Sequence, residues 1–141
     1  MIELMVVLAI VAIGVSVASL ALRDPALARL ERDAERLAAL LEMGRVEARA
    51  SGATASWAPA QAREPGSAHF RFTGLPARAG LPDRWLDDEV QAQIVGASRI
   101  VLGPEAILPQ QRVVLRLDPH RLEVGSDGLG AFAVRATPAT P

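Results

Sequence analysis

The chain has 141 residues, with 15 Lys and Arg side chains against 16 Asp and Glu and a formal net charge of −1. This length suits one compact domain with an attached segment, and the charge balance gives no sign of a nucleic-acid partner. Cysteine is absent, which excludes disulfides and thiolate metal sites.

The first feature along the chain is an uncharged apolar run from Leu4 to Leu22. As a helix it would span roughly 28 Å, close to the hydrocarbon core of a bilayer. No basic residue precedes the run, which argues against a cleaved secretory signal, and a buried helix of this length would have a polar face. We predict a transmembrane helix within residues 1–22, anchored by Leu4, Val7, Leu8, Ile10, Val11, Ile13, Val17 and Leu20.

The second feature is an amphipathic segment, residues 23–52, in which apolar or small residues recur at steps of three and four. This spacing places them on one face of a helix. That stripe consists of Leu27, Leu30, Ala34, Leu37, Leu41, Gly44 and Ala48. The opposite face is expected to carry Arg29, Glu31, Arg32, Asp33, Glu35, Arg36, Glu42, Arg45, Glu47 and Arg49.

The ends and pairings of this segment also follow from its sequence. Pro25 is compatible with a first helical turn capped by Asp24, or with a kink in one continuous rod, and Gly52 should end the helix. The spacing predicts weak surface pairs between Arg29 and Asp33 and between Glu42 and Arg45. The apolar stripe is most simply the face that packs on a C-terminal domain, with a partner helix as the alternative.

Residues 53–135 predict a small β domain of five to seven strands, and residues 136–141 a flexible tail. Strand-like segments occur at 69–73, 99–103, 112–117, 121–125 and 131–135. A turn at 118–120 and a tight connection at 126–130 would join the last three strands, whereas 77–89 is expected to be a loop or short irregular element. The fold class is therefore α+β, with a long N-terminal helix packed on an antiparallel β domain.

The search for reactive groups finds few candidates. His69 and His120 are expected to be exposed rather than catalytic, and Trp57 and Trp85 to serve packing. The sequence Asp87-Asp88-Glu89 could bind calcium but lacks the usual ligand spacing, so a solvated loop is the simpler interpretation. We predict no active site, no metal and no cofactor.

Glu3 stands immediately before the apolar run. A carboxylate at a hydrocarbon boundary is costly unless it is paired or hydrated, although a helix N-terminus favours negative charge. By itself Glu3 could simply mark the edge of the membrane.

The string IELMVVLAIVAIG, in which Ile2-Glu3-Leu4 precede the apolar helix, resembles the mature N-terminus of the type IV pilin and pseudopilin superfamily. The amphipathic half, with Arg45-Val46-Glu47-Ala48 near its end, and the C-terminal QQRVVLRLDPHRLEVGSDGLGAFAV are similar to the H-type minor pseudopilins of type II secretion and to the related FimT-like minor pilins. The middle of the chain, 53–98, carries no such likeness.

The resemblance implies a pilin-like, non-enzymatic subunit of a periplasmic pseudopilus that helps to export folded proteins across the outer membrane. Glu3 would pair with the N-terminal amine of a neighbouring subunit, and residues 1–22 would serve as membrane anchor and then as filament core. The expected location is the inner membrane of a bacterium, crossed once, with the C-terminal domain in the periplasm. The implied partners are other minor pseudopilins, the major pseudopilin and the inner-membrane assembly platform.

Two alternatives remain beside this interpretation. One is a FimT-like minor pilin of a type IV pilus, acting in adhesion, motility or DNA uptake; the single Arg in the C-terminal RATPATP disfavours DNA binding. The other is a membrane-anchored periplasmic binding domain.

One departure from the family concerns the N-terminus. Met1 stands where the family has Leu, without the preceding residues and leader that a prepilin peptidase recognises. We expect the natural translation start to lie upstream, which would restore cleavage and the family's methylated N-terminal amine; a shortened or nonfunctional copy is the alternative.

Overall fold

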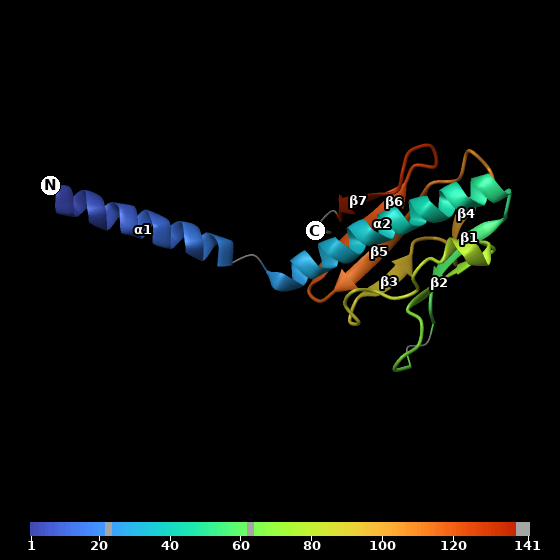
Figure 1. Ribbon diagram of the computed structural model, residues 1–141, viewed down its shortest axis with the longest axis horizontal. Helices are drawn as coiled ribbons and strands as arrows, with labels where there is room; N and C mark the ends of the chain where they lie inside the picture. The colour runs from blue at the N-terminus through green and yellow to red at the C-terminus, as the bar shows by residue number, and fades with distance from the viewer. Residues whose placement is uncertain (22–23, 62–63, 138–141) are drawn as a thin grey trace.

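The computed structural model describes residues 1–21, 24–61 and 64–137, and of Leu20 and Ala21 the backbone alone. It has the α+β architecture that the sequence predicts, with a small antiparallel β domain, but the N-terminal part forms two helices (Figure 1). The predicted tail falls partly outside this description, because 138–141 are not included, and Ala136 is paired in the last strand.

Helix α1, Ile2–Ala21, extends away from the rest of the molecule (Figure 1). Within Ile2–Ser19 the mean hydropathy is 2.4 and no residue is buried. By length and composition α1 could cross a membrane. The two serine hydroxyls near its end are satisfied inside the helix: Ser16 donates to the carbonyl of Ala12 at 2.8 Å and Ser19 to that of Val15 at 2.9 Å.

Helix α2, Pro25–Ser51, begins as a separate helix capped by Asp24. This is the first of the two alternatives for Pro25, and it corrects the expectation of one long N-terminal helix. Asp24 has an extended backbone, φ −60° and ψ 115°, and its carboxylate accepts the Ala26 N–H at 2.9 Å. The physical reason is Pro25, whose ring disfavours helical geometry in the preceding residue and suits the first turn of the next helix. At the other end Gly52 takes the left-handed conformation, φ 65°, as predicted.

Seven strands lie within the described residues and form two antiparallel sheets. Sheet A has the order β2-β1-β4, and sheet B the order β3-β5-β6-β7. Five strands match predicted segments. β1 and β3 were not predicted, because the short stretches ASWAP and QAQI offer little β-branched or aromatic signal. The bounds are β1 Ala55–Pro59, β2 Phe70–Thr73, β3 Gln91–Ile94, β4 Ile100–Gly103, β5 Gln111–Leu117, β6 His120–Ser126 and β7 Ala133–Ala136, with a 3-10 turn at Ala77–Ala79.

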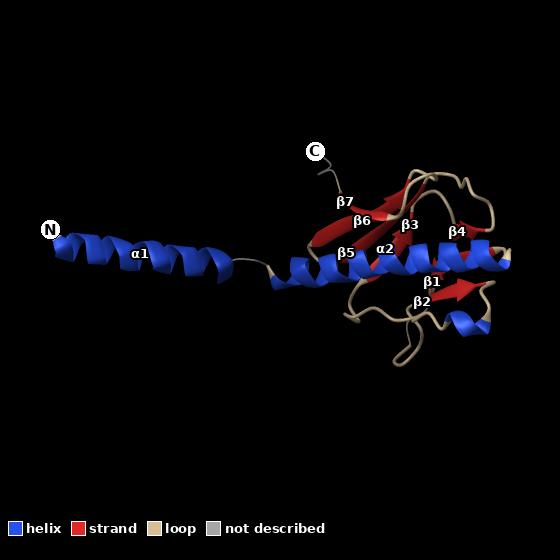
Figure 2. Ribbon diagram, turned by 45° about the horizontal axis from the view of Figure 1, so that its top comes forward, coloured by secondary structure: helices blue, strands red, loops and turns tan. Residues whose placement is uncertain are grey.

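Helix α2 lies across both sheets (Figure 2) and contacts β1 and β4 of sheet A and β5, β6 and β7 of sheet B. The helix packs tightly on sheet A at Gly44, where a Cβ atom would come within 2.9 Å of Leu102 and 3.1 Å of Phe72. The stripe named above faces the sheets. Of its seven residues Leu27 is half-buried, and Leu30, Ala34, Leu37, Leu41, Gly44 and Ala48 are buried.

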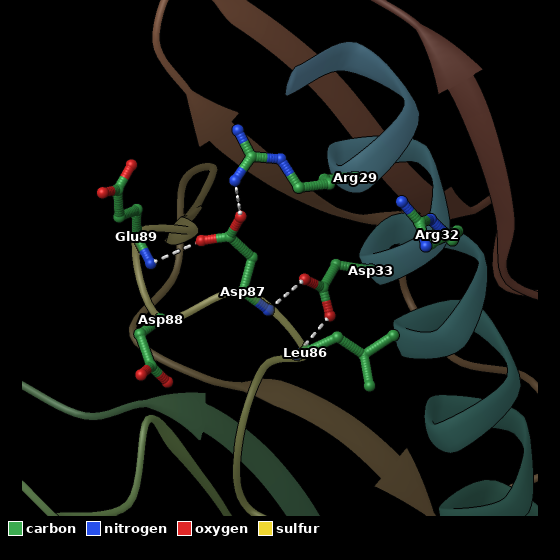
Figure 3. A pocket seen from close by; sticks show the side chains of 7 residues that line it. All are labelled: Arg29, Arg32, Asp33, Leu86, Asp87, Asp88 and Glu89. Atoms are coloured by element: carbon green, nitrogen blue, oxygen red, sulfur yellow. Dashed lines mark hydrogen bonds and ion pairs between the residues drawn. The ribbon is translucent and has the colours of Figure 1, made fainter. Parts of the chain in front are cut away.

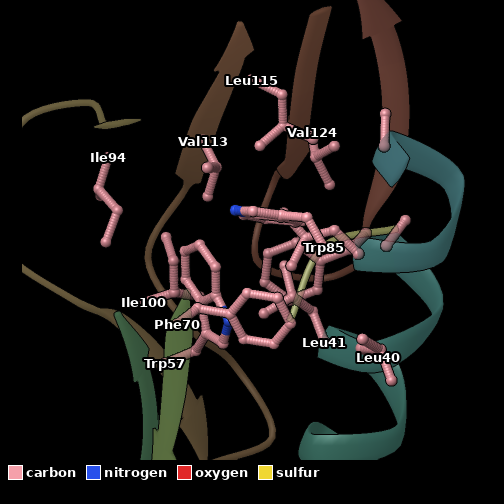
Figure 4. Close-up of a cluster of buried hydrophobic side chains, with 14 of the residues drawn as sticks. Leu40, Leu41, Trp57, Phe70, Trp85, Ile94, Ile100, Val113, Leu115 and Val124 are labelled. Atoms are coloured by element: carbon pink, nitrogen blue, oxygen red, sulfur yellow. The ribbon is translucent and has the colours of Figure 1, made fainter. Parts of the chain in front are cut away.

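The core between α2 and the sheets centres on three aromatic rings (Figure 4). Phe70 and Trp85 have ring centroids 4.6 Å apart, and Trp57 lies 5.7 Å from Phe70. Trp57 and Phe70 are fully buried, and Trp85 nearly so, which agrees with a packing role for both tryptophans. Trp85 comes from the 77–89 segment, so that loop is part of the core.

Gln111 joins the two sheets. Its side-chain amide donates to the carbonyl of Val101 at 2.9 Å and accepts the Val101 N–H at 2.6 Å. The side chain thereby imitates a neighbouring strand along the open side of β4. The backbone N–H and carbonyl of Val101 on the edge strand β4 are therefore already hydrogen-bonded, which hinders pairing with a further strand.

Candidate functional site

The apolar surface of α1 is not covered by any other part of the chain that the structure describes. Those anchor residues whose side chains are described are all exposed; these are Leu4, Val7, Leu8, Ile10, Val11, Ile13 and Val17. The side chain of Leu20 lies outside the description. Apolar groups on every side of a helix require lipid or other apolar helices around them.

Glu3 lies in the first turn of α1 and is exposed. Among the residues that the structure describes, none forms a hydrogen bond or ion pair with its carboxylate. The helix dipole offers it a modest stabilisation. The described residues therefore leave the Glu3 carboxylate open to a partner beyond them.

The start of α2 is tied to the turn between β5 and β6. His120 Nε2 lies 2.6 Å from Asp24 Oδ2, while the other oxygen of Asp24 caps the helix. The hydrogen bond with His120, and next the N–H of Ala26, hold the pKa of the Asp24 carboxyl below its ordinary value. Half-buried His120 is therefore a tether for the helix start rather than an isolated exposed side chain.

This junction predicts acid sensitivity. Because the pKa of Asp24 is lower in the folded state, its contribution is complete above the free-carboxyl pKa of about 3.9 and is lost as pH falls through the lower folded value. Asp127, whose pKa is lowered by the N–H groups of Gly130 and Leu129, acts in the same direction. Asp24→Asn should therefore flatten, without abolishing, the fall of Tm with acidification.

The measurement is the Tm of the unmodified chain and of Asp24→Asn as a function of pH, in detergent, with tryptophan fluorescence as the unfolding signal. Asp118→Asn, which removes an exposed carboxylate from the same turn, is the control and should follow the unmodified profile. Superimposable profiles for Asp24→Asn and the unmodified chain would show that the tether carries no pH dependence.

Further along α2, the 83–89 loop is fastened to the helix (Figure 3). The buried Asp33 carboxylate accepts the N–H groups of Leu86 at 2.8 Å and Asp87 at 3.1 Å. Arg29 pairs with Asp87 at 2.9 Å, so the predicted Arg29–Asp33 pair is wrong. Both side chains have better partners on a distant segment, which the local spacing could not reveal.

Next to this loop is an open cleft of about 460 Å³ lined by the side chains drawn in Figure 3. Asp88 and Glu89 point in different directions there, and Asp87 is engaged by Arg29 and by the Glu89 N–H. Within the described residues no group of three or more potential ligands is placed to hold a metal ion. The cleft therefore presents mixed charge without a converging set of ligands.

His69 departs from the expectation of exposure. Its side chain is buried, and Nδ1 accepts the N–H of Trp85 at 3.0 Å. An accepting Nδ1 places the ring proton on Nε2, which lies 3.7 Å from an Asp88 oxygen. His69 thus helps to position Trp85, and hence the loop, against the core.

The sequence Arg45-Val46-Glu47-Ala48 has a structural role at the far end of α2. The guanidinium of Arg45, 3% exposed as a residue, donates to the carbonyls of Gly130 at 2.8 Å and Gly128 at 3.2 Å. It also lies 3.5 Å from Glu42, which confirms the predicted pair. Glu42 in turn accepts the Phe132 N–H at 2.9 Å. The connection from β6 to β7 is therefore clamped to α2 by two charged side chains.

Asp33 and Arg45 were expected on the solvated face of α2, and both are buried. The stripe itself contained the signal: Asp33 lies three residues after Leu30 and four before Leu37, whereas Arg45 lies four after Leu41 and three before Ala48. Charged residues at those steps border the buried face and must be paired there.

Comparison of the chain with family models, with curated proteins and with solved structures found no match.

Proposed function

We propose that this chain is a pilin-like, non-enzymatic subunit, an H-type minor pseudopilin of a type II secretion system that is anchored in the bacterial inner membrane with its β domain in the periplasm. The observation that carries the proposal is α1: it is apolar on every side, exposed over Ile2–Ser19, and bears in its first turn a carboxylate with no partner among the described residues. Such a helix suits a lipid bilayer and, equally, a bundle of like helices.

The role proposed for Glu3 is to select the register between subunits. Inside a bundle of apolar helices the dielectric constant is low, so a carboxylate without a positive partner is strongly disfavoured. The N-terminal amine of a neighbouring subunit would supply that partner at one axial position and not at others. Pairing would thereby guide the subunit from the membrane into the filament.

The attachment of α2 to the β domain supports the same assignment, whereas its separate start departs from the one long helix that the resemblance implied. α2 is held to the β domain by its buried stripe, by Asp33 and by Arg45, whereas no residue within Ile2–Ser19 of α1 is buried. The chain thus combines a folded domain, made of α2 and the two sheets, with an apolar helix α1 that is free to contact lipid or other helices. The loop clamp formed by Arg45 and Glu42 also gives a packing reason for part of the sequence likeness described above.

The test separates membrane insertion from assembly. Glu3→Gln should insert into the membrane normally, because it removes a charge from an apolar helix. Assembly with neighbouring subunits, followed by cross-linking through introduced cysteines in this cysteine-free chain, should fall by at least about 100-fold, from the ~3–5 kcal/mol cost of breaking a buried pair. Secretion should be lost with it.

The matched control is Glu31→Gln, which removes an exposed carboxylate from α2. It should leave insertion, cross-linking and secretion unchanged. If Glu3→Gln behaves like this control, the chain is better described as a membrane-anchored binding domain, for which Glu3 only marks the end of the anchor. Loss of pilus function in place of secretion would favour the FimT-like alternative.

A further inference from the structure

The outer face of sheet B, turned away from α2, carries a group of arginines. Cross-strand pairing places Arg116 opposite Arg121, and Glu123 lies between Val114 on β5 and Arg135 on β7. Directly paired side chains in a sheet are about 5 Å apart at Cβ, and diagonal neighbours about 7–8 Å. The exposed members, which we call the basic face, are Arg112, Arg116, Arg121 and Arg135.

Acidic groups balance this face only in part. Arg112 lies 3.8 Å from Glu123, and Arg116 lies 2.9 Å from Asp118. Arg121 makes no ion pair with any residue in the described portion of the chain. Asp127 interacts electrostatically with Arg135. The four arginines still outnumber these acidic side chains, so the face is net positive although the whole chain has a net charge of −1.

The basic face begins beside the end of α1. Arg116 and Arg121 flank the β5–β6 turn. His120, the first residue of β6 after this turn, is hydrogen-bonded to Asp24 at 2.6 Å. Asp24 follows Ala21, the last residue of α1, by three positions, so their Cα atoms are at most about 10 Å apart. The turn is therefore held near the point where the apolar helix ends, whatever the direction of α1 (Figure 1).

We propose that the basic face docks on anionic phospholipid headgroups of the leaflet from which α1 emerges, and this rests on the membrane insertion of α1 contained in the proposed function. Two independent observations carry it, the net positive charge of the face and its tether beside the helix end. Nucleic acid would suit the charge but would not account for the tether. Each arginine close to an anionic surface contributes about fivefold to local association, and salt weakens the contact.

The experiment uses the full chain labelled at one position. A dye at Gln93→Cys, an exposed position of β3 near the basic face, reports energy transfer to acceptor lipids in nanodiscs of phosphatidylcholine with or without phosphatidylglycerol. We expect greater transfer in the anionic discs. High salt, or Arg116→Gln with Arg121→Gln, should lower it to the phosphatidylcholine level. The matched control, Arg71→Gln with Arg99→Gln, removes two exposed arginines elsewhere and should leave it high.

The result that overturns the proposal is equal transfer in both lipids, or transfer that neither salt nor the Arg116/Arg121 substitutions reduce. The salt measurement on the otherwise unmodified chain keeps the test valid if the double variant folds poorly. Duplex DNA that binds through Arg116 and Arg121, with no effect of lipid charge, would instead assign the face to nucleic acid. Failure of the chain to enter nanodiscs would refute the anchor itself, a distinct result that removes both proposals.

Discussion

Replacing Arg45 by methionine is expected to lower the free energy of unfolding of the α2–β domain by about 2–3 kcal/mol. The methionine keeps most of the buried stem but removes the guanidinium, which donates to the carbonyls of Gly128 and Gly130. A hydrogen bond from a charged donor contributes about 1.5–3 kcal/mol. The substitution also removes the cost of burying the guanidinium charge, and this gain offsets part of the loss of the two hydrogen bonds. The connection from β6 to β7 should lose its hold on α2.

Denaturant unfolding of the full chain in detergent, followed through the buried Trp57 and Trp85, provides the measurement. Arg49→Met is the matched control, because Arg49 is an exposed arginine one turn further along α2 with a single bond, to the carbonyl of Ala106. Its effect should be below about 1 kcal/mol. Equal effects of the two substitutions would mean that the clamp contributes nothing beyond a surface contact. Hydrogen exchange should show faster opening of 127–132 in the Arg45 variant alone.

Asp33→Ala is expected to cost a similar amount, about 2–3 kcal/mol. Its carboxylate is fully buried and accepts the N–H groups of Leu86 and Asp87. Removing the carboxylate leaves these two partly buried N–H donors without an acceptor, and each such donor costs about 1–3 kcal/mol. Water that enters at the cleft recovers part of this cost. Asp33→Asn retains one acceptor oxygen and should lose about half as much.

Glu35→Ala is the control for this series, since Glu35 is exposed two residues further along the same helix. The fluorescence of Trp85, adjacent to Leu86 in the fastened loop, should shift toward that of a solvated indole in Asp33→Ala before global unfolding. A loss no larger than that of Glu35→Ala, with an unchanged spectrum, would contradict the assigned role of Asp33.

Much of the local structure follows directly from short-range pattern. The apolar run, the steps of three and four in the stripe, the Asp24-Pro25 start and the Gly52 end each depend on residues within one or two helical turns. The β5–β6 hairpin is equally local, with its turn at Asp118-Pro119 between two alternating strands. Such signals are strong because the chain neighbours themselves supply the geometry.

The segments that were missed have weak local signals and strong tertiary ones. β1 lies between β2 and β4, so both of its edges are paired although its own residues have little β preference. Its position is decided by partners that come later in the sequence. The 77–89 segment likewise has no regular pattern, yet Trp85 lies in the core through contacts with His69 and the aromatic rings.

The apolar stem with Glu3 at its start, the amphipathic second helix and the β character of the remainder follow from residues close together in the chain, because periodicity and capping act over a few residues. Long-range packing, by contrast, buries Asp33 and Arg45, brings Asp24 to His120, and places arginines from three strands on one face. These groups are far apart along the chain. Their distances depend on how α2 packs on two sheets, which hydrophobic burial sets without regard to sequence separation.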